Sequence, residues 1–196
     1  MMVYGGMQIR TQGEVKKMRY FYDFEFSENG STIEPISLGM VSEDNRQLYL
    51  INNTYMRRVW EKKHIPNPWL QENVINKITD EDAAKFGYNI KLFPDLVLKF
   101  ISDNGKYKSR DEIELWGHYA AYDHVCLAQL WGPMINLPEP IPMFTHEDMT
   151  IKRDQPYLTR DLNKYPEHHA LYDAKFQRLQ SEYWQYPSML IFKQEE

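Results

Sequence analysis

The chain has a single cysteine, Cys126, among its 196 residues. One thiol cannot form an internal disulfide, and it cannot supply the several sulfur ligands of a cysteine-rich zinc site. Long apolar runs are absent too, so we expect no transmembrane helix. Glycine and polar residues interrupt the first ten positions, where a signal peptide would need an apolar stretch. Together these absences predict a protein of the reducing cytoplasm.

Positive charge is also in short supply. Lysine and arginine number 23 against 28 acidic residues, which gives a formal net charge of −5. Proteins that coat DNA usually carry a net positive footprint, so a histone-like or repressor-like role is not expected. An enzyme that acts on nucleic acid remains compatible with this balance, because carboxylates that bind metal ions count as negative until the ions arrive.

Aromatic and apolar residues are plentiful. They make up 14% and 42% of the sequence, which argues against global disorder. A chain of this length suits one domain and buries roughly 70% of its unfolded surface. We expect that domain over residues 18–196. Residues 1–17 carry three glycines and no stable period, and we expect them to form a peripheral N-terminal extension.

The first part of the domain predicts an antiparallel meander of three strands. Residues 19–26 read R-Y-F-Y-D-F-E-F, an aromatic enrichment typical of a strand. Alternation then places two sets of side chains on opposite faces: Tyr20, Tyr22, Phe24 and Phe26 on one, and Arg19, Phe21, Asp23 and Glu25 on the other. Further strands are expected over 36–41 and 47–51, joined by a short polar turn.

The remainder predicts helices around one more strand. Helices are expected over 54–64, 93–101, 123–131 and 168–184, and a strand over 113–116. The last helix is expected to bury a stripe of Tyr172, Phe176, Leu179 and Tyr183, and the first a stripe of Met56, Val59 and Trp60. This order predicts an α/β fold with a mixed sheet, in which the meander is joined by parallel strands and flanked by helices.

Asp23 and Glu25 are candidate metal ligands. Side chains two residues apart on a strand leave the same face, and carboxylate oxygens suit a hard divalent ion. The D-x-E spacing is common by chance, and a wet polar face is the alternative interpretation. The aromatic surroundings favour a central strand, where two like charges are costly without a counter-ion.

Asp123, His168 and Asp173 are the other candidates. Asp123 shares an apolar helix face in the first turn, where an acid that complements the helix dipole is the alternative. His168 and Asp173 are five residues apart, and on one continuous helix they would face about 140° from each other. They converge only if His168 precedes the helix and Asp173 lies within it. His169 is a neighbouring alternative to His168.

The order of these residues resembles the DEDD superfamily of 3′–5′ exonucleases in its histidine subclass, because the tyrosine subclass would need a tyrosine at position 169. Within it the chain is similar to the bacterial exoribonuclease AS group, which is related to ribonuclease T and described as degrading adenylate-rich RNA. The similarity rests on residues 19–26, T-I-E-P-I-S-L-G at 32–39, E-L-W at 114–116, A-Y-D-H-V-C-L-A-Q-L-W-G-P-M at 121–134 and H-H-A-L-Y-D-A at 168–174. One departure is Tyr119, where the wider superfamily often has an asparagine.

The resemblance implies a ribonuclease H-like fold and a metal-dependent 3′–5′ exoribonuclease that releases 5′-mononucleotides. Asp23, Glu25, Asp123 and Asp173 would hold two divalent cations, Mg²⁺ or Mn²⁺, with Asp23 bridging both. His168 would take the proton from the attacking water. Single-stranded RNA is the implied partner, and a homodimer is implied because ribonuclease T-like enzymes are often dimeric.

Substrate contacts are less sharply defined by the sequence. Single strands are bound by stacking on aromatic rings and by basic side chains on phosphates. Phe26, Trp116 and Tyr119 are candidate stacking residues, although a core position is the alternative for Phe26. Arg153 and Arg160 are candidate phosphate contacts. Two other functions stay open at this point: the same hydrolysis on single-stranded DNA, and a protein that binds nucleic-acid ends without cutting.

Overall fold

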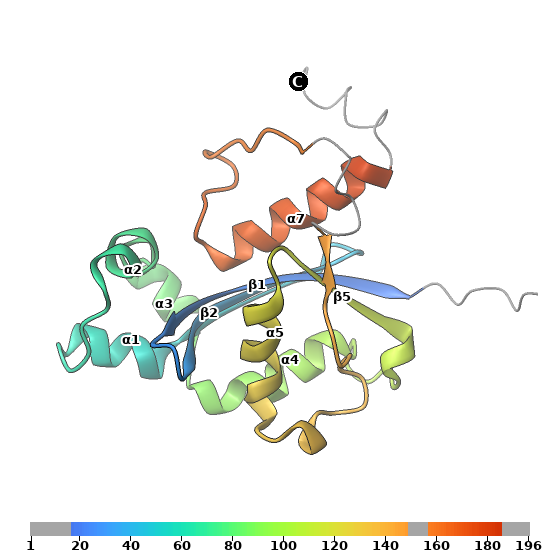
Figure 1. The fold of residues 1–196 in the computed structure, drawn as a ribbon, viewed down its shortest axis with the longest axis horizontal. Coiled ribbons are helices and arrows are strands. Elements are labelled where there is room, and N and C mark those ends of the chain that lie inside the picture. Colours follow the sequence, from blue (N-terminus) through green and yellow to red (C-terminus); the bar gives the residue numbers. More distant parts are fainter. Residues whose placement is uncertain (1–16, 149–156, 186–196) are drawn as a thin grey trace, which may run out of the picture.

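The structure of the protein is a computed structural model that describes residues 17–148 and 157–185. A mixed sheet in the order β4-β3-β2-β1-β5-β6 forms the centre, and helices cover both of its faces (Figure 1). Residues 1–16 and 186–196 lie outside the described residues, so the proposed extension over 1–17 and the end of the domain at 196 stay predictions.

The predicted meander is confirmed. β1 (Met18–Glu28), β2 (Ile33–Ser42) and β3 (Gln47–Asn52) pair antiparallel in sequence order. Asp23 lies opposite Gly39 in this register, and the pairing is irregular between Glu25 and Phe26. β1 is therefore a central strand, as its aromatic sequence predicted.

The parallel part of the sheet is confirmed as well. β5 (Ile113–Gly117) runs parallel to β1, β6 (His146–Glu147) parallel to β5, and β4 (Gly87–Tyr88) parallel to β3. The mixed sheet and its flanking helices are consistent with a ribonuclease H-like fold.

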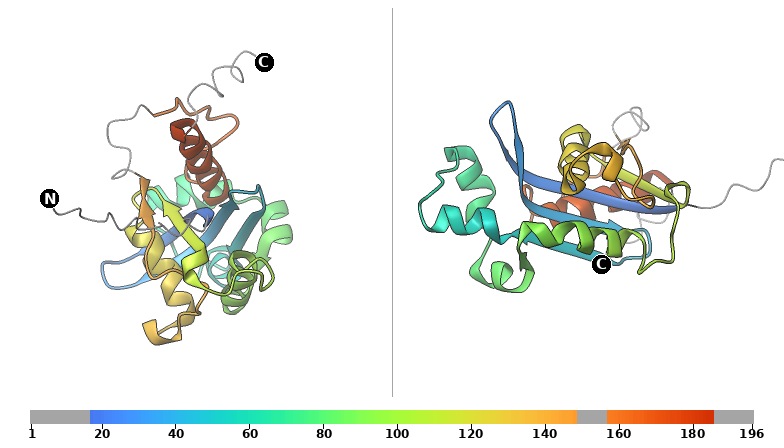
Figure 2. Two further views of the ribbon diagram at one scale, coloured as in Figure 1. Left: turned by 90° about the vertical axis from the view of Figure 1, so that its right-hand side faces the viewer. Right: turned by 90° about the horizontal axis from the view of Figure 1, so that it is seen from below.

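One face of the sheet carries the main core. Tyr20, Tyr22 and Phe24 point from β1 into it, as alternation predicted. α4 (Phe93–Ile101) and α5 (Ala121–Ala128) close this face, and Phe93, Val97, Ile101, Cys126 and Leu127 are fully buried against it. Figure 2 shows these two helices on the side of the sheet opposite to α7 (Ala170–Gln185).

Three short helices cover the β3–β4 end of the sheet (Figure 1). α1 (Asn53–Trp60) begins where the Asn52 side chain accepts hydrogen bonds from two backbone N–H groups. α2 (Pro68–Asn73) has proline in its first turn, and α3 (Asp80–Phe86) begins with a capping box at Thr79. Single 3₁₀ turns complete the chain at Ile75–Lys77, Ile90–Leu92, Arg110–Glu112, Gln129–Trp131 and Met134–Asn136.

One predicted helix face was correct in part and one was wrong. On α1, Met56 is buried and Val59 packs against the same cluster, but Trp60 is 50% exposed, and Tyr55 is the aromatic residue that the helix buries instead. On α7, the buried positions include Ala174, Gln177, Ser181 and Trp184, whereas the predicted stripe of larger residues is only half-buried. Small and polar residues face the sheet because α7 lies too close to it for a layer of large side chains.

Gly39 of β2 is what lets α7 begin so near the sheet. A Cβ atom at this position would stand 2.3 Å from the backbone of Ala170, the first residue of α7. No real side chain fits in that space. Since Gly39 is opposite Asp23 in the sheet, the first turn of α7 is held directly over the acidic residues of β1.

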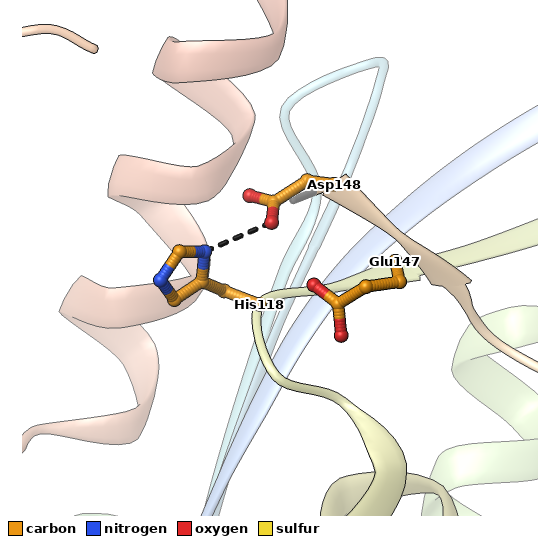
Figure 3. Close-up of side chains that lie close together, drawn as sticks. All are labelled: His118, Glu147 and Asp148. Atoms are coloured by element: carbon orange, nitrogen blue, oxygen red, sulfur yellow. Dashed lines mark hydrogen bonds and ion pairs between the residues drawn. The ribbon is translucent and has the colours of Figure 1, made fainter. Parts of the chain in front are cut away.

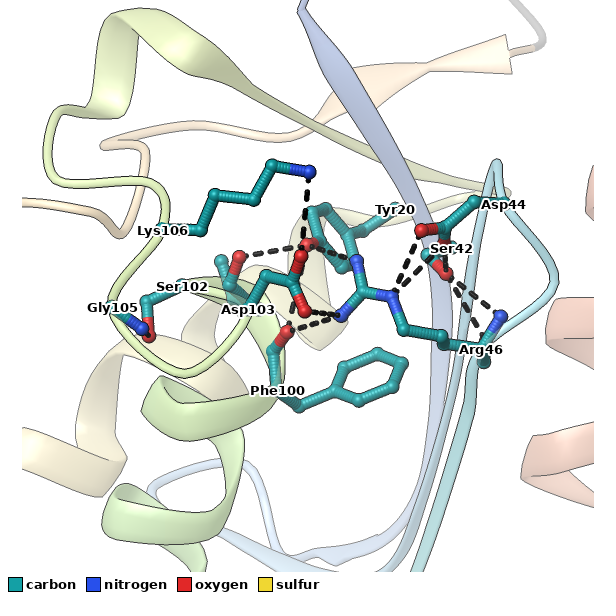
Figure 4. A network of polar contacts seen from close by, with 10 residues as sticks. Tyr20, Ser42, Asp44, Arg46, Phe100, Ser102, Asp103, Gly105 and Lys106 are labelled. Carbon is teal, nitrogen blue, oxygen red and sulfur yellow. Dashed lines mark hydrogen bonds and ion pairs between the residues drawn. The ribbon is translucent and has the colours of Figure 1, made fainter.

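A polar clasp fastens the β2–β3 turn to the end of α4 (Figure 4). The guanidinium of Arg46 donates to the Tyr20 hydroxyl at 3.0 Å and to the Phe100 carbonyl at 3.1 Å, and it pairs with Asp44 and Asp103. Tyr20 in turn donates to the carbonyl of Ile101 at 2.7 Å. This network fixes the N-terminal part of β1 relative to α4.

Across residues 17–148 and 157–185, the helices are too short or too polar to span a membrane.

Candidate active site

Three carboxylates meet where β1 passes under the first turn of α7. Asp23 and Glu25 come from alternate positions of β1, and Asp173 comes from α7. Each offers an oxygen within 4.8 Å of the others. Residues separated by about 150 positions are therefore brought to one point, and Gly39 makes that approach sterically possible.

Asp123 reaches the same region from the first turn of α5. Its side chain is 6% exposed, and its Oδ1 accepts a 2.7 Å hydrogen bond from the backbone N–H of Phe24, the residue between Asp23 and Glu25. Asp123 does stand in the first turn, but its side chain also bonds across to β1. An interaction with the helix dipole, which was the alternative for Asp123, therefore does not fully explain the position of this side chain.

Burial and the charges of neighbouring acids raise the pKa values of Asp23, Glu25 and Asp123. Burial raises the pKa of Asp23 well above its usual range, and the charges of Asp123, Glu25 and Asp173 raise it further. Burial, followed by the charge of Asp173, raises the pKa of Glu25 to about 8. Burial raises the pKa of Asp123 to about 7, against the lowering effect of the Phe24 hydrogen bond. A cluster of acids with raised pKa values is stabilised either by bound protons or by a bound cation.

The donor set fits divalent metal ions. Carboxylate oxygens are the ligands that Mg²⁺ and Mn²⁺ prefer, and buried like charges at this spacing need positive charge. Arg160 pairs with Asp173 at 2.6 Å. Although burial raises the pKa of Glu25, the charges of Lys77 and Arg160 both act to lower it. Nε and Nη2 of Arg160 also donate to the carbonyls of Tyr165 and Pro166, each at 2.7 Å. Arg153, the other arginine singled out in this stretch, lies outside the described residues.

The two histidines of the third motif have different surroundings. His168 precedes α7 and Asp173 lies within it, which meets the condition set by their spacing. His168 has a positive φ of 55°, and its ring lies edge-on to Trp69 of α2 with centroids 4.9 Å apart. His169 is stacked on Tyr49 at 4.8 Å, and its backbone N–H donates to Asp173 at 2.8 Å. The structure thus turns the two imidazoles toward different neighbours.

The predicted stacking residues also differ in exposure. Phe26 packs against the main core and stacks on Tyr122 with centroids 5.8 Å apart. Trp116 is stacked on His146 at 4.8 Å, on the sheet face that also carries Phe21. Tyr119 is 68% exposed with a positive φ of 54°, which leaves its ring open to a partner.

The sequence reasoning missed a second cluster, formed by His118, Glu147 and Asp148 (Figure 3). His118 Nδ1 lies 2.8 Å from Oδ1 of Asp148. Glu147 accepts hydrogen bonds from the backbone N–H groups of Tyr119 and Ala120, at 2.9 and 2.8 Å. The two acids follow a proline-rich stretch without any period, so no pattern in the sequence indicates that they meet His118.

A cavity of about 260 Å³ joins this cluster to the acids of β1 and α7. Its lining residues are Asp23, His118, Asp148, Tyr157, Arg160, Glu167, Asp173, Phe176, Gln177 and Gln180. Asp23 and Asp173 are therefore accessible from this cavity, as a hydrolytic site requires.

Comparison with known proteins adds an independent finding. A family model described as the 3′–5′ exoribonuclease Rv2179c-like domain matches residues 18–185, from the start of β1 to the end of α7. Two curated relatives come from Mycobacterium tuberculosis: 3′–5′ exoribonuclease Rv2179c of strain ATCC 25618 / H37Rv and 3′–5′ exoribonuclease MT2234.1 of strain CDC 1551 / Oshkosh. Each is 37% identical over 165 residues, which cover 82% of this chain and 89% of the relative.

Proposed function

The chain belongs to the family of the 3′–5′ exoribonuclease Rv2179c-like domain, and on that premise we propose that it hydrolyses single-stranded RNA from a free 3′ end and releases 5′-mononucleotides. The observation that carries this proposal is the convergence of Asp23, Glu25 and Asp173 within 4.8 Å, with Asp123 bonded to the strand between the first two. An adenylate preference belongs to the proposal as the resemblance implies it.

The proposal assigns the chain to the histidine subclass of DEDD exonucleases. Asp23, Glu25, Asp123 and Asp173 would hold two divalent cations, Mg²⁺ or Mn²⁺, and the raised pKa values of Asp23, Glu25 and Asp123 support that role. Bound there, the cations would supply positive charge to the attacking and leaving oxygens of an in-line displacement at phosphorus. The four carboxylates would determine where the cations bind, and in this way how the phosphodiester is oriented.

His168 is the proposed general base. It would accept a proton from the attacking water, a task that histidine performs more often than any other side chain. Its place two residues before α7 supports the role, because the helix carries Asp173 to the acids while His168 stays on the connecting loop. Trp69 packs against the imidazole and limits the directions in which it can turn.

Hydrolysis of single-stranded DNA and end-binding without cleavage are outcomes of the same experiment. Oligoadenylate, RNA of mixed sequence and single-stranded DNA, each labelled at the 5′ end, are incubated with the protein and Mg²⁺ or a chelator. The proposal predicts a ladder that shortens from the 3′ end of RNA with Mg²⁺ and no cleavage with chelator. Faster degradation of DNA than of RNA, or binding without shortening, would contradict it.

A 3′-terminal phosphate and a circular RNA test the direction of attack. Both should resist digestion, because the proposed reaction needs a free 3′ hydroxyl. Efficient cutting of the circle would identify an endonuclease and overturn the exonucleolytic assignment.

A further inference from the structure

His118 forms a hydrogen-bonded pair with Asp148, unlike a histidine that is free on the surface. Its Nδ1 lies 2.8 Å from Oδ1 of Asp148, which is only 7% exposed and comes from the chain just after β6. The rings of Tyr119 and Tyr157 stand edge-on to the imidazole, with centroids 4.6 and 6.2 Å away. These contacts fix both the tautomer and the direction of the ring.

The other ring nitrogen, Nε2, is available. Within residues 17–148 and 157–185 it has no hydrogen-bond partner, and Figure 3 shows it directed away from Asp148 toward α7. His118 lines the same cavity as Asp23 and Asp173. A fixed imidazole therefore presents one open ring nitrogen, Nε2, to the pocket in which the proposed hydrolysis takes place.

The cluster is less suited to a metal ion of its own. Its three residues offer ligand atoms within 4.8 Å of one another, which by itself is compatible with a cation. However, Nδ1 of His118 is engaged by Asp148, and both oxygens of Glu147 accept backbone N–H groups at the start of α5. The atom left over is Nε2 of His118, which is a hydrogen-bond donor when the imidazole is protonated.

We propose that His118 is a substrate-binding residue whose Nε2 donates a hydrogen bond to a phosphate oxygen of the RNA strand in the cavity shared with Asp23 and Asp173, with Asp148 as its positioning residue. This inference rests on the proposed function, because it takes RNA as the occupant of the cavity. We favour a phosphate oxygen as the partner because a protonated Nε2 donates a hydrogen bond. The cavity is lined by acids and holds little other positive charge that could bind a phosphate.

The surrounding charges support a cationic imidazole. The hydrogen bond with Asp148 raises the pKa of His118 against the lowering effect of burial, and the charges of Asp148, Glu147 and Asp173 act in the same upward direction. Arg160 is the other cationic side chain that lines the cavity, and it is committed to Asp173. A protonated His118 would add a positive charge to this cavity beside that of Arg160.

The test is steady-state kinetics of His118→Gln on a 3′-hydroxyl RNA oligonucleotide with Mg²⁺. Hydrogen bonds to charged groups predict a rise in KM of roughly 10- to 100-fold with a smaller change in kcat. The matched control is His124→Gln. His124 lies on α5 and, like His118, uses Nδ1 for a hydrogen bond, in this case with Thr145, but it does not line the cavity. This control should leave KM within about threefold of the parent.

Oligonucleotides with one neutral methylphosphonate linkage identify the contact itself. Moved one linkage at a time from the 3′ end, the substitution should raise the KM of the parent enzyme at one position and add nothing further at that position in His118→Gln. Asp148→Asn, which keeps an acceptor but removes the charge, should show part of the same loss and serves as a second variant if His118→Gln does not fold.

The possible outcomes distinguish a failure of this inference from a failure of the proposed function. If the parent enzyme degrades RNA but His118→Gln and Asp148→Asn behave like His124→Gln, the phosphate contact is wrong and the exonuclease stands. If the variants lower the number of Mn²⁺ ions bound per chain without changing the response to methylphosphonates, the cluster is a metal site and the inference is overturned. If the parent does not degrade RNA at all, the proposed function fails first.

Discussion

The backbone N–H of Phe24 donates a 2.7 Å hydrogen bond to Oδ1 of Asp123. This bond joins β1 to the first turn of α5 at the residue that separates Asp23 from Glu25. It gives the carboxylate of Asp123 a structural task in addition to its proposed metal-binding one, and the two tasks can be separated by substitution.

Asp123→Asn and Asp123→Leu form a matched pair. The amide oxygen of asparagine can still accept from Phe24, so Asp123→Asn should unfold close to the parent temperature while losing hydrolysis. Leucine leaves the buried N–H without a partner, which costs about 1–3 kcal/mol. Thermal unfolding and RNA degradation are measured on both. Equal stability of the two variants would show that the hydrogen bond contributes little.

Stability without metal ions should depend on pH in a defined direction. The folded-state pKa values of Glu25, about 8, and Asp123, about 7, lie above their ordinary values of 4.5 and 3.8, so the folded state retains protons that the unfolded state releases. Their contribution to stability is complete below about pH 4 and is lost as pH rises toward 8, by up to about 1.4 kcal/mol per pH unit for each group.

Chemical denaturation in a chelator between pH 5 and pH 8 measures this effect. The free energy of unfolding should fall as pH rises, and Glu25→Gln should flatten the slope because the amide does not titrate. Saturating Mg²⁺ should stabilise the protein most at the high end of the range, where the acids are ionised. A free energy that is constant or rises across this range in the chelator would contradict the electrostatic account.

His168 and His169 offer an internal comparison of the proposed base. His168→Ala should lower kcat by about 10²–10⁴-fold and leave metal binding intact, because general-base catalysis contributes in that range. His169→Ala should be mild for kcat, although the loss of stacking on Tyr49 should lower its stability. If the His169 variant lost the catalytic step and the His168 variant kept it, the register of the third motif would be wrong.

Gly39→Ala tests how the site is assembled. The added methyl group would stand 2.3 Å from the Ala170 backbone, so α7 must shift and carry Asp173 away from Asp23. We expect a loss of roughly 1–3 kcal/mol or more and weaker Mn²⁺ binding. Ser37→Ala, two residues away on the same strand face, removes an atom instead of adding one and is the control. A stable Gly39→Ala protein with unchanged Mn²⁺ affinity would refute the close-approach argument.

Much of the sheet could be predicted because its signals are local. The aromatic alternation of residues 19–26 fixes which side chains enter the core, and short polar turns force the meander that follows. The site residues Asp23, Glu25 and Asp123 could be singled out for the same reason, since each stands in an element with a clear period. Their roles as metal ligands stay predictions.

What the sequence could not supply depends on contacts between distant segments. The face that α7 buries is set by how closely Gly39 lets it approach the sheet, which a helical period does not encode. Likewise, Asp148 meets His118 only because β6 pairs with β5, and the two-residue strand β6 has no recognisable pattern. Trp69 reaches His168 through the packing of α2, in a stretch whose structure the sequence left ambiguous.

The most direct test of the account is the Asp23→Asn variant, assayed on 5′-labelled RNA at saturating Mg²⁺. Asp23 is buried among three other acids, so the change removes a negative charge that the apo fold disfavours, and the variant should fold at least as stably as the parent. The account predicts that it no longer shortens RNA from the 3′ end. A folded Asp23→Asn protein with activity within tenfold of the parent would contradict the proposed metal centre.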